Sequence, residues 1–73
     1  MRTFSMTRFH DESGVSGTGI VLVGVEFLDG TVVVQWIVKN KPSSITTYKS
    51  FADFELIHIS SHPTNNTIIT WNN

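Results

Sequence analysis

The sequence predicts a small all-β domain, a partly open barrel of about five short strands with one short helix late in the chain. Runs of β-branched residues flank an Asp-Gly pair near the middle of the chain, and this pattern indicates a β-hairpin. Short β-rich segments lie on both sides of that hairpin, and one serine-capped segment with helical spacing comes late. These patterns together favour strands of even spacing around a single core.

The chain has 73 residues and no cysteine. That length leaves room for one domain, residues 1–73, and domains of this size are only marginally stable. Without cysteine, neither disulfides nor zinc-thiolate sites can stabilise the fold. Because 40% of the residues are hydrophobic and only 15% are charged, the composition favours self-association into a homo-oligomer.

Charge and hydropathy restrict where the protein acts. The formal net charge is −1 at pH 7, so the overall field does not draw the chain to nucleic acid. The first residues, MRTFSMTRFH, lack the apolar core of a signal peptide, and no apolar run approaches the roughly 18 residues of a membrane span. We therefore expect a cytoplasmic protein that does not contact membranes.

The first strand is expected to end near Phe9, because Phe4 and Met6 alternate with hydroxyl-bearing residues. The run HDESGVSGTG, residues 10–19, follows it and precedes a strongly apolar stretch. Glycines beside hydroxyls and acids can hold a ligand or only turn the chain. A connecting loop is the default interpretation, and a binding role for this loop stays open.

The stretch GIVLVGVEFLDGTVVVQWIVK predicts a hairpin with a two-residue type I′ turn at Asp29-Gly30. In that register Leu28 faces Thr31, and one face of the hairpin carries Val21, Val23, Val25, Phe27, Val32, Val34, Trp36 and Val38. The opposite face, which includes Leu22, Val33 and Ile37, is either covered by another part of the chain or offered to a partner. Gly24 is expected to mark a bend or bulge.

The second half predicts a strand over 45–50, a helix beginning after Ser50, and a last strand over 67–71. Ser50 is a good helix cap, and Asp53 can complete a capping box. The apolar stripe of this helix consists of Phe51, Phe54 and Ile57. The set of elements suggests an SH3-like barrel, and the alternative is a coiled antiparallel sheet with the helix packed on it.

Enzymatic chemistry is not indicated. His58 and His62 are four residues apart, and Asp11 and Glu12 adjoin His10. The proline at 63 and the poor helix signal before it argue against a metal site at this spacing. The glycine-rich run lacks the lysine of a P-loop and does not open a helix. We therefore predict a protein that is not an enzyme and has no cofactor or metal.

A family resemblance adds to this interpretation. The segments FHDESGVSGTGIVLVGVEFLDGTVVVQW, YKSFADFELIHI and TIITW resemble a family of small proteins from phages, prophages and archaeal or bacterial genomes. Its motif is close to D-E-S-G-V-S-G-T-G, then G-V-x-F-x-D-G-T-V-V and a tryptophan. Gln35 departs from the basic residue expected before that tryptophan. The resemblance implies a phage accessory protein, and it assigns no catalytic or ligand-binding residues, so it does not indicate an activity.

Two functions remain open. The first is binding of a protein partner, as an inhibitor of a host defence or regulatory protein. The second is binding of a nucleotide or nucleic acid, for example sequestration of a signalling nucleotide, with loop amides and a modest basic edge contacting phosphate. The candidate binding residues are Asp11, Glu12, Ser16, Thr18, Leu22, Val33 and Ile37.

Overall fold

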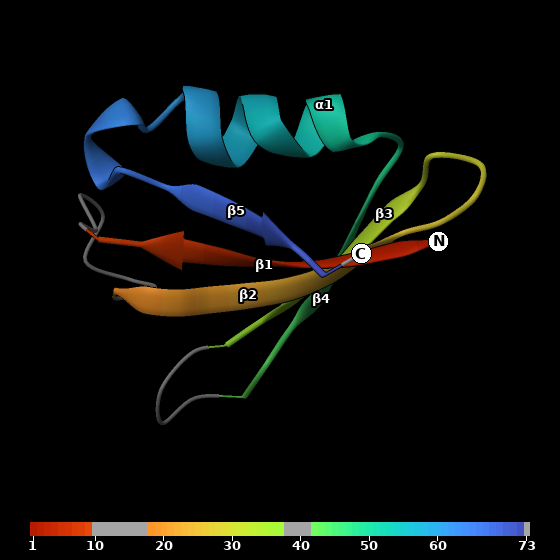
Figure 1. Ribbon diagram of the computed structural model, residues 1–73, viewed down its shortest axis with the longest axis horizontal. Helices are drawn as coiled ribbons and strands as arrows, with labels where there is room; N and C mark the ends of the chain where they lie inside the picture. The colour runs from red at the N-terminus through yellow and green to blue at the C-terminus, as the bar shows by residue number, and fades with distance from the viewer. Residues whose placement is uncertain (10–17, 38–41, 73) are drawn as a thin grey trace.

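Five antiparallel strands form one open sheet, and a single helical segment crosses one of its faces in the computed structural model, which describes residues 1–9, 18–37 and 42–72 (Figure 1). The strands are β1 (Arg2–Arg8), β2 (Gly19–Glu26), β3 (Val32–Trp36), β4 (Ile45–Tyr48) and β5 (Ile68–Trp71). Their order is β4-β3-β2-β1-β5, so β4 and β5 are the edges. The all-β prediction with a late helix is confirmed. The arrangement is the open sheet with a packed helix that stood as the alternative to an SH3-like barrel.

β1 shows the predicted alternation. Phe4 and Met6 are buried on the helix-covered face, with exposed fractions of 1% and 0%, and the residues between them lie on the other face. Arg8 continues the buried row and is only 5% exposed. β1 is a central strand, paired with β2 on one side and β5 on the other. The buried core is therefore built from β1, β2, β3 and Phe54, and β5 adds only partly buried side chains.

The turn between β2 and β3 differs from the prediction. The Phe27 N–H donates to the Thr31 carbonyl (2.8 Å), and the Gly30 N–H donates to the Phe27 carbonyl (3.0 Å). The loop is therefore three residues long, and only Gly30 has positive φ (+94°), whereas a type I′ turn would require it at Asp29 as well. The Asp29 carboxylate instead accepts a hydrogen bond from the Thr31 N–H at 2.9 Å.

This one-residue difference shifts the register of the whole hairpin. Val25 pairs with Val33 and Gly24 with Val34. The apolar side chains of the two strands that were expected to share one face therefore lie on opposite faces of the sheet. Leu22 was expected on the outer face, but it is 0% exposed in the core. A bulge between Met6 and Thr7 in the β1–β2 ladder allows Val21 and Leu22 to be buried together. Val38 lies outside the described residues.

Gly24 has a packing role. A Cβ atom at this position would lie 2.5 Å from the Phe4 ring and 3.0 Å from Val34. Because the Phe4 ring is held by three other aromatic side chains, it has little freedom to move away. Gly24 therefore lets the Phe4 ring lie across β2, whereas the bulge of β2 lies elsewhere.

The helix begins as predicted and then widens. The Ser50 side chain accepts a hydrogen bond from the Asp53 N–H (3.1 Å) at the start of α1 (Phe51–Glu55). α1 runs directly into a π-helical turn, η1 (Leu56–Ser60). The wider turn leaves Ile57 50% exposed, whereas Phe54 is fully buried. A 3₁₀ turn, η2 (Pro63–Asn65), then leads to β5.

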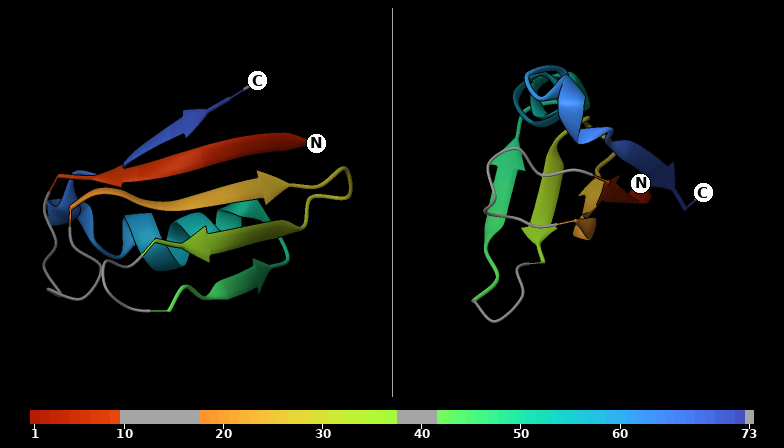
Figure 2. Two further views of the ribbon diagram at one scale, coloured as in Figure 1. Left: turned by 90° about the horizontal axis from the view of Figure 1, so that it is seen from below. Right: turned by 90° about the vertical axis from the view of Figure 1, so that its left-hand side faces the viewer.

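An aromatic cluster joins the helix to the sheet. Phe54 lies between the rings of Phe4, Tyr48, Phe51 and His58, with centroid distances of 5.3–5.7 Å. Phe4 also contacts Trp71 of β5 at 4.9 Å. The helical segment lies against only one face of the sheet, and no other element of the described chain covers the opposite face (Figure 2).

Candidate functional site

The predicted binding residues are dispersed in the structure. Asp11, Glu12 and Ser16 lie outside the described residues, and Thr18 is exposed at the start of β2. Leu22 is buried in the core, so the folded chain does not present it to a partner. Of the remaining two, Ile37 is 47% exposed just past β3, and Val33 lines a groove on the uncovered face of the sheet.

This uncovered surface, which we call the open face, consists of two rows of side chains running across four strands. The strand registers align Thr3, Val25, Val33 and Thr47 in one row. They align Ser5, Val23, Gln35 and Ile45 in the other. None of these eight side chains is charged or aromatic.

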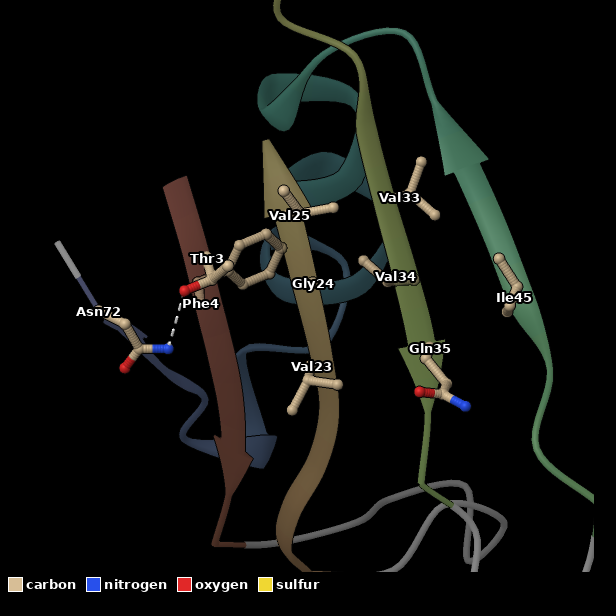
Figure 3. Close-up of a pocket in the computed structure, with 10 residues that line it drawn as sticks. All are labelled: Thr3, Phe4, Val23, Gly24, Val25, Val33, Val34, Gln35, Ile45 and Asn72. Carbon is tan, nitrogen blue, oxygen red and sulfur yellow. Dashed lines mark hydrogen bonds between the residues drawn. The ribbon is translucent and has the colours of Figure 1, made fainter. Parts of the chain in front are cut away.

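A groove with a volume of about 330 Å³ runs along the open face (Figure 3). Ile45 and Val23 are its most exposed apolar residues, at 69% and 41%. The Asn72 amide donates to the Thr3 hydroxyl (3.3 Å) at the side nearest the carboxyl end of the described chain. No described residue lining the groove has a titratable side chain, so the groove offers apolar contact and a few neutral hydrogen-bonding groups.

The helix-covered face holds the titratable cluster. Tyr48 Oη lies 2.6 Å from His58 Nε2, and the His58 ring contacts Trp36 at a centroid distance of 5.0 Å. Burial, and then the positive charge of Arg8, hold the pKa of His58 below its usual range. Burial raises the pKa of Tyr48. The tyrosine therefore keeps its proton, and its hydroxyl shares a hydrogen bond with a neutral imidazole.

This environment accounts for His58 as a partly buried hydrogen-bonding residue. Its Nε2 faces the tyrosine hydroxyl. Within the described ranges no group of three or more histidine and acidic side chains gathers to hold a metal ion. The His10, Asp11 and Glu12 set lies outside those ranges.

Comparison with known families gives one match over the whole chain. The family model described as Acb5 phage protein matches residues 1–73. The chain belongs to the Acb5 phage protein family. The expected relationship to a family of small phage proteins is thereby confirmed. Searches of curated proteins and of solved structures found no match.

For this Acb5 family member, sequence reasoning missed the residues that make the open face. A two-residue turn predicts Val23 and Val25 on the core side, whereas the three-residue turn places them on the open face. Ile45 was assigned to a strand, but its position on the edge strand β4 follows only from the sheet order. A three-residue loop that ends in glycine is the next most common hairpin connection after the two-residue turn, and it needs positive φ only at Gly30. No helix in the described ranges is long and apolar enough to cross a membrane.

Proposed function

We propose that this chain is a non-enzymatic phage accessory protein that binds a host protein through the open face and thereby inhibits a host defence or regulatory protein. The observation that carries the proposal is the uncharged, partly apolar groove on a sheet face that no described element covers. Contiguous apolar surface on a small domain commonly marks a protein interaction site. Membership of a phage protein family supports an accessory role.

The composition of the open face favours a protein over a nucleic acid. Surfaces that bind single-stranded nucleic acid combine aromatic stacking platforms with basic side chains. The two rows of the open face have valine, isoleucine, threonine, serine and glutamine side chains and neither of those groups. The Phe4 ring also lines the groove, but it is only 1% exposed and offers no stacking surface. Apolar contact surrounded by neutral hydrogen-bonding groups is typical of the core of a protein interface.

The test begins with affinity purification of the tagged chain from the bacterial host of a phage that encodes it, with mass spectrometry of the captured proteins. The dissociation constant of the captured protein is then measured against the wild type, Ile45→Asp and Leu56→Asp. Leu56 is a matched control because it is 64% exposed but lies on the helix. Thermal melting confirms that each variant is folded.

We expect Ile45→Asp to weaken binding at least about tenfold, or about 1.4 kcal/mol, because a carboxylate would be placed in an apolar contact. Leu56→Asp should bind as the wild type does. Equal binding by the wild type and Ile45→Asp would contradict the open face as the contact surface. Loss of binding by Leu56→Asp alone would move the contact to the helix.

A second candidate function, the binding of a nucleotide or nucleic acid, is favoured by one observation. The Arg8 side chain is almost fully buried, and its Nε has no hydrogen-bond partner. The β1–β5 ladder ends with Thr7 opposite Ile68, so Arg8 and Thr67 are the residues that follow this last pair, and the buried Thr67 hydroxyl also lacks a partner. A guanidinium beside a hydroxyl is suited to a phosphate group.

This alternative predicts that inorganic phosphate or a nucleotide raises the melting temperature. Cyclic and linear nucleotides are screened by thermal shift at low and high salt, because binding to phosphate weakens as salt rises. A salt-sensitive shift that Thr67→Val abolishes would support the nucleotide function. No shift across the panel would exclude it and leave the protein-binding proposal.

A further inference from the structure

The tip of the β2–β3 hairpin is the most exposed apolar feature of the described chain. Leu28 is 91% exposed, and Phe27 and Met1 beside it are 41% and 66% exposed. These three side chains, with Asp29 and Thr31, surround a shallow hollow at the end of the sheet. The loop projects past the amino-terminal end of β1 (Figures 1 and 2).

The turn that presents Leu28 is held in place. Backbone hydrogen bonds join Phe27 to Thr31 and to Gly30, and the Asp29 carboxylate accepts from the Thr31 N–H. Gly30 supplies the positive φ that the loop requires. Because the turn is already ordered, a partner that binds it loses less conformational entropy than one that binds a flexible loop.

A leucine has no packing role at this position. Turn positions usually carry Gly, Pro, Asn, Asp or Ser, each of which favours the turn geometry. Leu28 is almost fully exposed to solvent, so its side chain contributes little to the core. Asp29 next to it is held in the charged form, because the hydrogen bond from the Thr31 N–H lowers its pKa.

We propose that the hairpin tip is the anchor of the protein interface, with Leu28 inserted into a concave apolar pocket of the partner and Asp29 facing a basic side chain on the rim of that pocket. The inference rests on the proposed function and deepens it by describing the partner. The partner is a protein with a leucine-sized apolar pocket bordered by lysine or arginine. A convex apolar tip requires a concave counterpart, and the adjacent carboxylate requires a positive charge.

The tip also continues the open face. Val23 and Val25 lie on that face of β2, and Phe27 is the next residue in the same alternation. Val33 faces Val25 across the hairpin, so apolar side chains extend from the groove to the turn. One partner can therefore cover the groove and receive the tip together.

Binding constants for the captured host protein test the anchor. We expect Leu28→Ala to raise the dissociation constant about tenfold or more, because truncating an anchor residue removes most of its contact. Leu28→Met should stay within about twofold of the wild type, since methionine fills a similar apolar volume. Leu56→Ala is the matched control and should bind normally. Asp29→Asn should reduce the salt dependence of the association rate.

Photo-crosslinking identifies what the tip touches. A benzophenone amino acid in place of Leu28 should crosslink to the captured protein within an apolar pocket bordered by lysine or arginine, whereas the same amino acid in place of Leu56 should not. A crosslink between two copies of the chain would overturn the proposal in favour of self-association. Flotation with phosphatidylcholine vesicles that depends on Leu28 would overturn it in favour of a membrane.

The two proposals fail in different ways. If Leu28→Ala binds like the wild type while Ile45→Asp does not, the anchor is wrong and the open-face function stands. If neither substitution changes the dissociation constant, the open-face function is wrong as well.

Discussion

Single side chains in this protein often have a role that their residue type alone would not suggest. Gly24 lies in the middle of a strand, where glycine usually indicates a bend, but here it makes room for the Phe4 ring. His58 is one of two histidines at metal-ligand spacing, but its ring is hydrogen-bonded to Tyr48 and packs against Trp36. In both cases the deciding neighbour is distant in sequence.

The environment of His58 predicts a pH dependence of stability. Burial, and then Arg8, hold its pKa below the ordinary 6.5, so the unfolded chain binds a proton more readily than the folded one. The stabilising contribution of the neutral imidazole is complete above pH 6.5 and is lost as the pH falls below that value. We expect the urea midpoint of the wild type to decline on acidification through this range.

The measurement compares urea unfolding of the wild type, His58→Gln and His62→Gln above and below pH 6.5. His58→Gln should show a smaller decline than the wild type. His62→Gln should keep most of the decline, because His62 is the smallest of the three causes that lower the pKa of His58. Parallel pH profiles for the wild type and His58→Gln would show that His58 is not the responsible group.

Among the secondary-structure elements, the hairpin shows how one turn determines the exposure of many residues. The sequence indicates both strands correctly, but Asp-Gly is compatible with a two-residue loop and with a three-residue loop that ends in glycine. Side chains alternate along a strand, so the difference of one residue moved Leu22 into the core and Val25 onto the open face. The local sequence does not distinguish the two registers, whereas packing against the helix does.

Gly30 is expected to be essential to this turn. Its φ of +94° is strained for any residue with a Cβ atom, so Gly30→Ala should lower the free energy of unfolding by about 1–2 kcal/mol. Gly30→Asn should cost less, because asparagine tolerates positive φ better than alanine does. Urea unfolding of both variants measures the difference. Wild-type stability of Gly30→Ala would show that the turn has another geometry in solution.

The helix shows the same division between local and distant causes. The Ser50 cap was evident from the spacing, and the structure confirms it, because the Ser50 hydroxyl accepts a hydrogen bond from the Asp53 N–H. The π-helical turn that begins at Leu56 was not evident from the sequence. A turn of this kind depends on how the side chains that follow it pack against the sheet. The His58 ring lies 5.3 Å from the Phe54 ring four residues earlier, whereas Ile57 is half-exposed.

The stability of the domain depends on a single contact layer between helix and sheet, and Phe54 is at its centre. Phe54→Ala should cost about 3–5 kcal/mol, a large part of the roughly 4–11 kcal/mol expected for a domain of this length. Leu56→Ala, at a position 64% exposed on the same segment, should change stability by less than about 0.5 kcal/mol. Thermal unfolding by circular dichroism compares the two. Similar melting temperatures would show that the helix does not stabilise the sheet.

The amino-acid sequence by itself determined the strands, the start of the helix, the core side of β1 and the relationship to small phage proteins. The structural features among these follow from local causes, namely side-chain alternation, β-branched runs and a capping serine. Only the tertiary structure decided the hairpin register, the open sheet and the position of the groove. Val33 and Ile45 lie on one surface because β3 pairs with β4, and Val25 joins them because of the turn. Such pairings are set by packing between distant segments, which the local pattern of residues does not record.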